Sequence, residues 1–284
     1  MLRLQTLLLA TAVVGAAGSL ARADEMGASV SGATPSASDT DRFTLPKGKL
    51  VLDAFVEMNL SSGEAFKPVS ITPDLWYGVN DDVTIGLVHS GVGATGFLDA
   101  VGNSLCITGS SNGCAHVYNN VGLDGRIRIA KPWAVDAGLY INSISDPFQL
   151  AVKLGIDGRW TWSKLALELQ PSFFLGLTNR EPVTTGTGGT TATVSLVQNT
   201  ETLYVPATLS YLVAPKFDLA LQAGLYLPFT NTSQIWAIPL AIGARYAVSA
   251  KFGLGLAFSF PELIGGSTST ASARTLLLGG SYAF

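Results

Sequence analysis

The sequence predicts an all-β fold, an antiparallel transmembrane β-barrel of about 12 strands, and three observations support this prediction. Apolar and polar residues alternate in repeated segments, as in strands with one apolar and one polar face. The connections between these segments are short and long in turn. The chain is also apolar, with 48 % hydrophobic and 13 % charged residues and a mean hydropathy of +0.36. Beyond the N-terminus it nevertheless lacks an uninterrupted apolar run of about 18 residues, which a membrane-spanning helix needs.

The alternation is clearest in residues 50–60, "LVLDAFVEMNL". Leu52 and Val56 share one face of this segment, whereas Asp53 and Glu57 share the other. A period of two predicts a strand, because a helix would distribute the two acids differently. Most of the segments are long enough to cross a bilayer as tilted strands, which takes about 9–11 residues. The others lie at residues 69–79, 83–90, 121–129, 133–142, 150–160, 165–177, 202–212, 217–227, 236–248, 252–260 and 274–284.

Four prolines fall inside these predicted strands. Proline has no N–H to donate, and a closed barrel has no free edge on which to place it. We therefore expect β-bulges at Pro73, Pro171, Pro206 and Pro239.

Every second connection is very short, at residues 80–82, 130–132, 163–164, 214–216 and 249–250. The others include two long segments rich in Gly, Thr and Ser, at residues 91–116 and 178–200. Short periplasmic turns and long extracellular loops are typical of outer-membrane barrels. The alternative, a soluble all-β protein with a large core, does not explain this asymmetry.

Aromatic residues support the membrane interpretation, since they gather beside the short turns on the apolar face of the strands. Amphipathic rings at one height form an interfacial girdle. The alternative is a set of core aromatics that happen to lie at strand ends. The predicted girdle consists of Tyr77, Trp133, Trp160, Trp162, Tyr211 and Tyr246, with Phe217, Phe252 and Phe284 at the same level.

The N-terminus has the layout of a cleavable secretory signal. Arg3 precedes an apolar stretch, and Ala21-Arg22-Ala23 provides a cleavage site. The alternative is an N-terminal membrane anchor, for which the stretch is short. We expect residues 1–23 to be removed, residues 24–48 to form a flexible tail and residues 49–284 to form the barrel. The chain has no Lys/Arg-rich run, so nothing in it suggests a nucleic-acid partner.

The two cysteines, Cys106 and Cys114, enclose a short polar segment. An exported chain meets an oxidising compartment, so we expect a disulfide between them. A metal site is a poor alternative, because the two cysteines and the nearby His116 form an incomplete ligand set. We expect no metal and no cofactor.

The last strand ends in Phe284, with Tyr282 two residues before it and Gly279 further back. With this signal the chain resembles bacterial outer-membrane β-barrel proteins, although Leu277 stands where that family usually has a polar residue. The resemblance implies insertion into the outer membrane of a Gram-negative bacterium by the barrel-assembly machinery, with lipid as the surrounding partner. The stretch "ITPDLWYGVNDDVTIGL" is similar to the loosely defined, porin-like transporters associated with phenol-degradation pathways. We expect a monomer.

Inward-facing charged residues gather towards the short-turn half of the barrel, below a neutral polar vestibule. The predicted lumen residues are Asp74, Asp124, Arg126, Arg128, Asp136, Lys153, Asp157, Arg159, Glu168, Asp218 and Arg245. With Asp53 and Glu57 they give eight acids and five bases, a formal charge of −3. In one interpretation this belt constricts a narrow passive channel that favours small neutral or cationic solutes. In another, acids and bases pair and plug a structural or loop-displaying barrel.

A third function class is an outer-membrane lipid hydrolase with a His–Ser pair. His89 and Ser90 are adjacent, so in a regular strand they point to opposite faces and cannot form a nucleophile–base pair. His116 lies at the end of a long loop, where a solvated histidine is the simpler interpretation. The sequence therefore favours transport over catalysis, and we predict no catalytic residue.

Overall fold

The structure is a computed structural model that describes residues 43–89, 105–114, 116–144, 148–180, 182–185, 194–197, 199–230, 232–267 and 269–284. The predicted signal peptide and residues 24–42 of the predicted tail lie outside this part. The strands are β1 (Leu50–Asn59), β2 (Val69–Asn80), β3 (Val83–Val88), β4 (Leu105–Cys106), β5 (Val121–Ala130), β6 (Trp133–Ser143), β7 (Gln149–Trp162), β8 (Leu165–Leu169), β9 (Ser172–Gly176), β10 (Pro182–Thr185), β11 (Val194–Val197), β12 (Thr202–Ala214), β13 (Phe217–Pro228), β14 (Ala237–Ala247), β15 (Phe252–Gly265) and β16 (Thr275–Ala283). A 3-10 turn (Ser110–Asn112) and the one-turn helix α1 (Thr232–Ile235) lie in connections. In the described ranges, no helix has the length and apolar character to span a membrane.

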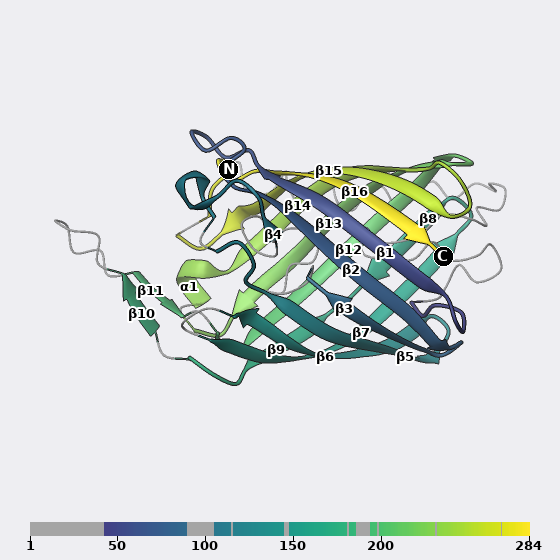
Figure 1. Ribbon diagram of the computed structural model, residues 1–284, viewed down its shortest axis with the longest axis horizontal. Coiled ribbons are helices and arrows are strands. Elements are labelled where there is room, and N and C mark those ends of the chain that lie inside the picture. The colour runs from purple at the N-terminus through teal and green to yellow at the C-terminus, as the bar shows by residue number, and fades with distance from the viewer. Residues whose placement is uncertain are drawn as a thin grey trace, which may run out of the picture.

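The sheet closes on itself as an antiparallel barrel (Figure 1). Strand β1 pairs with β2 on one side and with β16 on the other. The strand order is β1-β16-β15-β14-β13-β12-β8-β7-β6-β5-β3-β2. Strand β9 continues β8, since both pair with β7 and β12, so the described residues form twelve barrel strands. This confirms the predicted fold class.

Two prolines explain the interruption between β8 and β9. Pro171 lies two residues after the end of β8, and Pro206 of β12 lies opposite the intervening Gln170, whose N–H donates to the Pro206 carbonyl over 3.1 Å. Neither proline has an N–H for the ladder, so the regular pairing stops there. At Pro239 the pairing of β14 with β15 shifts register, as predicted. The predicted bulge at Pro73 is wrong, because β1 and β2 pair through it without a shift, and β12 and β13 likewise pair through Pro206.

The two ends of the barrel differ as predicted. Residues 81–82, 131–132, 163–164, 215–216 and 248–251 connect strands at one end, which we call the short-turn end. At the opposite end, the long-loop end, the β10–β11 hairpin projects away from the barrel (Figure 1). There the Cys106–Cys114 disulfide is formed, with 5.7 Å between the Cα atoms, which confirms the predicted pairing.

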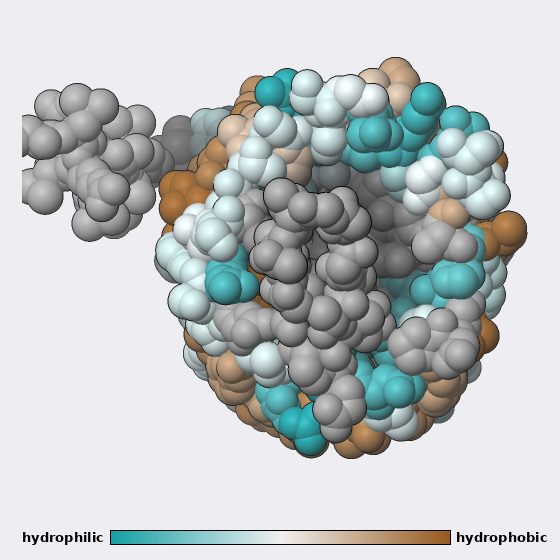
Figure 2. All heavy atoms as spheres, turned by 90° about the vertical axis from the view of Figure 1, so that its left-hand side faces the viewer, coloured by the Kyte–Doolittle hydropathy of each residue, from teal (hydrophilic) through white to brown (hydrophobic). Residues whose placement is uncertain are grey.

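The outer face is apolar and the inner face is polar. In β1 and β2, for example, Leu52 and Leu75 are exposed, whereas Asp53 and Asp74 are buried. Figure 2, which looks onto the long-loop end, shows hydrophobic residues on the outer margin of a ring and hydrophilic residues along its rim. Since this arrangement inverts that of a soluble protein, it suits a barrel surrounded by lipid.

The predicted girdle residues lie on this outer face beside the short turns. Tyr77, Trp162, Tyr211 and Tyr246 are exposed there. Trp133 and Trp160 are half-buried and not exposed, because their rings pack edge-to-face over Gly158, with 5.0 Å between the ring centroids. Gly158 has no side chain, so it leaves room for both rings.

The first and last strands, β1 and β16, pair with each other and form the seam that closes the barrel. Phe284 N–H donates to the Leu50 carbonyl over 3.0 Å. Gly279 lies directly opposite Phe55, and a Cβ atom at Gly279 would come within 2.8 Å of the Phe55 ring. Tyr282 and Phe284 are exposed and pack edge-to-face, with ring centroids 4.9 Å apart. The aromatic end of the chain is therefore part of the barrel wall.

Candidate functional site in the barrel lumen

The strand alternation turns all eleven predicted lumen residues to the inner face, and one of them differs from the others in its partner. Arg128 follows the same alternation, but it lies beside the short turn and bonds Asp82 at the rim, with 2.8 Å from Nε to Oδ1. Arg128 therefore pairs at the exposed mouth and not with the acids deeper in the lumen. Without Arg128, the inward face of the described strands carries eight acids and four bases.

The largest charged cluster joins β5, β6 and β7. Lys153 Nζ lies 3.0 Å from Asp124 Oδ2 and also contacts Asp136. The Tyr140 hydroxyl donates to the same Asp124 oxygen over 2.7 Å. Lys153 is thus held between two carboxylates, one of which is fixed in place by a tyrosine.

Arg126 belongs to the same cluster and lies nearer the short-turn end. Its Nε lies 3.7 Å from Asp157 Oδ2, and its guanidinium stacks 4.4 Å from the centroid of the Trp76 ring. Trp76 in turn lies over Gly86 of β3, directly opposite, where a Cβ would come within 2.4 Å of the indole. Sequence reasoning missed Trp76, although its position two residues after the inward Asp74 indicated that it faces the lumen.

Two further ion pairs line the wall. Arg159 NH1 lies 3.4 Å from Glu168 Oε1, and both side chains are almost completely buried. Arg245 binds Asp218 through two nitrogens, over 3.0 Å and 2.7 Å, and also donates to Ser210 over 3.0 Å. Such forked contacts hold the guanidinium flat against the strands that carry it.

The ion pairs seen in the described lumen have one direction in common. They join β5 or β6 to β7, β7 to β8, and β13 to β14, so each pair spans adjacent strands or skips one strand. The pairs therefore run along the wall rather than across the lumen.

The remaining acids are unevenly distributed. Asp53 of β1 lies directly opposite Asp74 of β2, with both carboxylates on the inner face. The Asp74 carboxylate accepts a hydrogen bond from the His89 N–H over 2.6 Å. Across β15, β16 and the part of β14 before Arg245, the inner face carries small or neutral residues such as Ala241, Ala257 and Ser259. The lumen therefore has a charged, bulky side and a smaller, neutral side.

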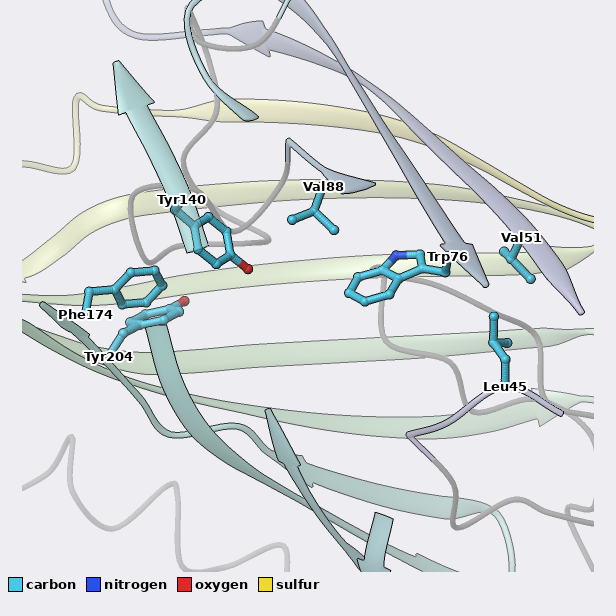
Figure 3. Packing of buried hydrophobic residues seen from close by; sticks show 7 residues of the cluster. All are labelled: Leu45, Val51, Trp76, Val88, Tyr140, Phe174 and Tyr204. Carbon is cyan, nitrogen blue, oxygen red and sulfur yellow. The ribbon is translucent and has the colours of Figure 1, made fainter. Parts of the chain in front are cut away.

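Aromatic rings line the lumen towards the long-loop end. Tyr140 and Phe174 pack edge-to-face with 5.7 Å between their ring centroids, and Tyr204 lies beside them (Figure 3). Gly122 and Gly138 leave space for the Tyr140 ring, since a Cβ at either position would come within 2.6 Å of it. The predicted neutral vestibule therefore has an aromatic side.

His89 does not form a catalytic pair within the described residues. Its Nδ1 contacts the Pro73 carbonyl, and its Nε2 lies 2.9 Å from the Tyr118 hydroxyl. Ser90 lies outside the described residues, and His116 is exposed on the loop. His89 thus connects the wall to the loop that carries the disulfide. In the part of the chain that the structure describes, no three His, Cys, Asp or Glu side chains are placed to hold a metal ion.

No protein-family model matches the chain, and no curated protein matches it. Solved structures with a similar fold include the COG4313 outer membrane channel from Pseudomonas putida F1, with 13 % identity, a TM-score of 0.51, and coverage of 85 % of this chain and 97 % of that chain. The KdgM porin, solved in complex with disordered oligogalacturonate, has 8 % identity and a TM-score of 0.51, with coverage of 82 % and 99 %. At such identities the likeness concerns the fold. The chain therefore has the fold of an outer-membrane β-barrel, as its sequence predicts.

Proposed function

We propose that the chain is an outer-membrane channel, a narrow passive pore for small solutes, with a preference for neutral and cationic ones. The observation that carries the proposal is the direction of the ion pairs. Pairs that link opposite walls would fill the lumen, whereas pairs between strands that are adjacent or one strand apart cover the wall and leave the axis to water and solute. The alternative, a structural barrel plugged by its own charges, requires the first arrangement.

The outer surface supports the membrane location. Exposed aliphatic residues cover the strands, and aromatic residues gather near the short turns. Such a surface matches a hydrocarbon layer with an interface on one side. Short turns facing the periplasm, insertion by the barrel-assembly machinery and a monomeric state belong to the same proposal.

The charge of the lumen supports the preference for cations. Eight inward acids face four inward bases, and Asp53 and Asp74 lie side by side. Walls of low dielectric constant focus the field of such a surplus into the water-filled path. Cations are thereby concentrated in the lumen and anions are excluded.

The test is planar-bilayer conductance of the purified, refolded protein, with reversal potentials measured in a salt gradient. We expect small steps and a permeability that favours potassium over chloride. The control is the migration shift between heated and unheated samples, which shows that the barrel is folded. A folded barrel without steps would refute the channel and favour the plugged structural barrel. Steps with a preference for chloride would refute the assigned role of the acids. Lipid hydrolysis by the same preparation would instead favour the hydrolase.

A further inference from the structure

The chain enters β1 from inside the barrel. Residues 43–48, which we call the inner strap, come directly before β1 and are not free, in contrast to the flexible tail predicted for residues 24–48. Gly48 turns the chain with a φ of 76°, a value that favours glycine. Its N–H donates to the Gly78 carbonyl over 2.7 Å, and the Gly78 N–H donates to the Lys49 carbonyl over 2.9 Å. These bonds tie the exit of the strap to β2.

The strap lies on the lumen side of the wall. The Leu45 N–H donates to Thr84 Oγ1 over 2.7 Å, and Thr84 is an inward-facing residue of β3. The Leu45 side chain is only 4 % exposed and packs in one cluster with Val51 and Trp76, which also face inward (Figure 3). Backbone and side chain thus place the strap inside the mouth at the short-turn end.

Gly78 provides the space in which the strap lies. A Cβ atom at Gly78 would come within 2.1 Å of the Pro46 carbonyl oxygen and 2.8 Å of the Leu45 oxygen. Both contacts are with backbone, which cannot give way as a flexible side chain can. The turn at Asp81 adds two bonds, 3.1 Å from Thr44 Oγ1 to its carbonyl and 3.0 Å from the Lys47 N–H to its carboxylate.

We propose that the inner strap sets the size limit of the path at the short-turn mouth. An extended backbone is itself about 5 Å wide, and the strap takes at least that width from the lumen beside β2 and β3. It also lies against Trp76, on which Arg126 stacks, so the strap and the charged belt form one constriction. The inference rests on the proposed channel, and it assigns to residues 43–48 the selection of solutes by size.

The test is the conductance of Gly78→Val, in which the added side chain occupies the position of the strap. We expect an increase of about twofold in conductance, since the mouth gains the width of one chain, and faster uptake of larger neutral sugars by proteoliposomes. The matched control is Gly253→Val, which adds the same side chain on the inner face at the same end. A Cβ at Gly253 meets nothing closer than 3.9 Å, so its conductance should not rise.

A second variant, Thr84→Val, keeps the side-chain shape and removes the acceptor of the Leu45 N–H. Hydrogen exchange followed by mass spectrometry should show the Leu45 amide protected in the wild type and exchanging at least tenfold faster in this variant, as expected for the loss of about 1.4 kcal/mol. If the wild type, Gly78→Val and Thr84→Val give conductance steps of equal size, the inference about the strap is refuted and the proposed channel still stands. If none of the three proteins gives conductance steps, the proposed channel is refuted and the inference with it. If the Leu45 amide of the wild type is not protected, residues 43–48 are not held inside the mouth, and the inference is refuted even when the barrel conducts.

Discussion

Replacing Arg126 with glutamine should make the lumen more selective for cations. Arg126 is one of four inward bases, and its guanidinium lies between Asp157 and the Trp76 ring. The substitution removes a positive charge from the path and leaves the Asp157 carboxylate without this neighbour. Both changes favour a cation and disfavour an anion in the constriction.

The size of the effect follows from the charge and its distance from the axis. A permeating ion that passes about 6 Å from the guanidinium, in water-like surroundings, interacts with it by about 0.7 kcal/mol. Removing that interaction changes the local concentration of a monovalent ion about threefold. Cations gain this factor and anions lose it, so the ratio of cation to anion permeability should rise by up to about tenfold.

The assay is the reversal potential in a gradient of potassium chloride, at low ionic strength so that screening stays weak. Arg128→Gln is the matched control, because Arg128 lies two residues away on the same face of β5. Its charge is paired with Asp82 at the exposed rim, so we expect a change in permeability ratio of less than about 1.5-fold.

Two results would refute this reasoning. An equal change in Arg126→Gln and Arg128→Gln would mean that the rim, and not the belt, controls selectivity. An unchanged ratio in Arg126→Gln, with the barrel folded, would mean that Arg126 does not line the path.

Three further predictions concern assembly and stability. Deleting Phe284 should impair insertion into the outer membrane and leave export intact, as membrane fractionation can show; normal insertion would contradict its role in the closing seam. Gly279→Val should lower the temperature at which the barrel unfolds in detergent, because the new Cβ meets a ring at 2.8 Å, whereas Gly280→Val, with its nearest neighbour at 3.7 Å, should not; equal losses would refute the packing argument. Tyr140→Phe removes the hydrogen bond to Asp124 and should cost about 1–2 kcal/mol in urea unfolding from vesicles; an unchanged unfolding midpoint would show that this bond does not stabilise the cluster.

Most of the barrel could be predicted from the sequence because the decisive signals are local. A period of two assigns each strand residue to one face, so Asp53 inside and Leu52 outside follow from neighbouring letters alone. The short turns, the aromatic girdle and the terminal Phe284 are also local signals. Even Trp76 could have been placed in the lumen, since the same period fixes its face.

The partners of those inward residues could not be predicted, because they depend on the register between strands. Lys153 pairs with Asp124 two strands away. Arg128 pairs with Asp82 in a short turn at the rim, although Arg126 and Arg128 look alike in the sequence. Pro206 continues its strand pairing with β13, yet on its other side it lies opposite Gln170, next to Pro171 and just past the end of β8, a coincidence that only the neighbouring strand reveals.

The sequence by itself therefore determined that this chain forms a barrel with a polar inside and an apolar outside. Only the tertiary structure decided which charges pair, that they pair along the wall, and that residues 43–48 lie inside the mouth. The physical reason is that a side chain's face depends on its own strand, whereas its height and its neighbours depend on how twelve strands shift relative to one another as the sheet closes.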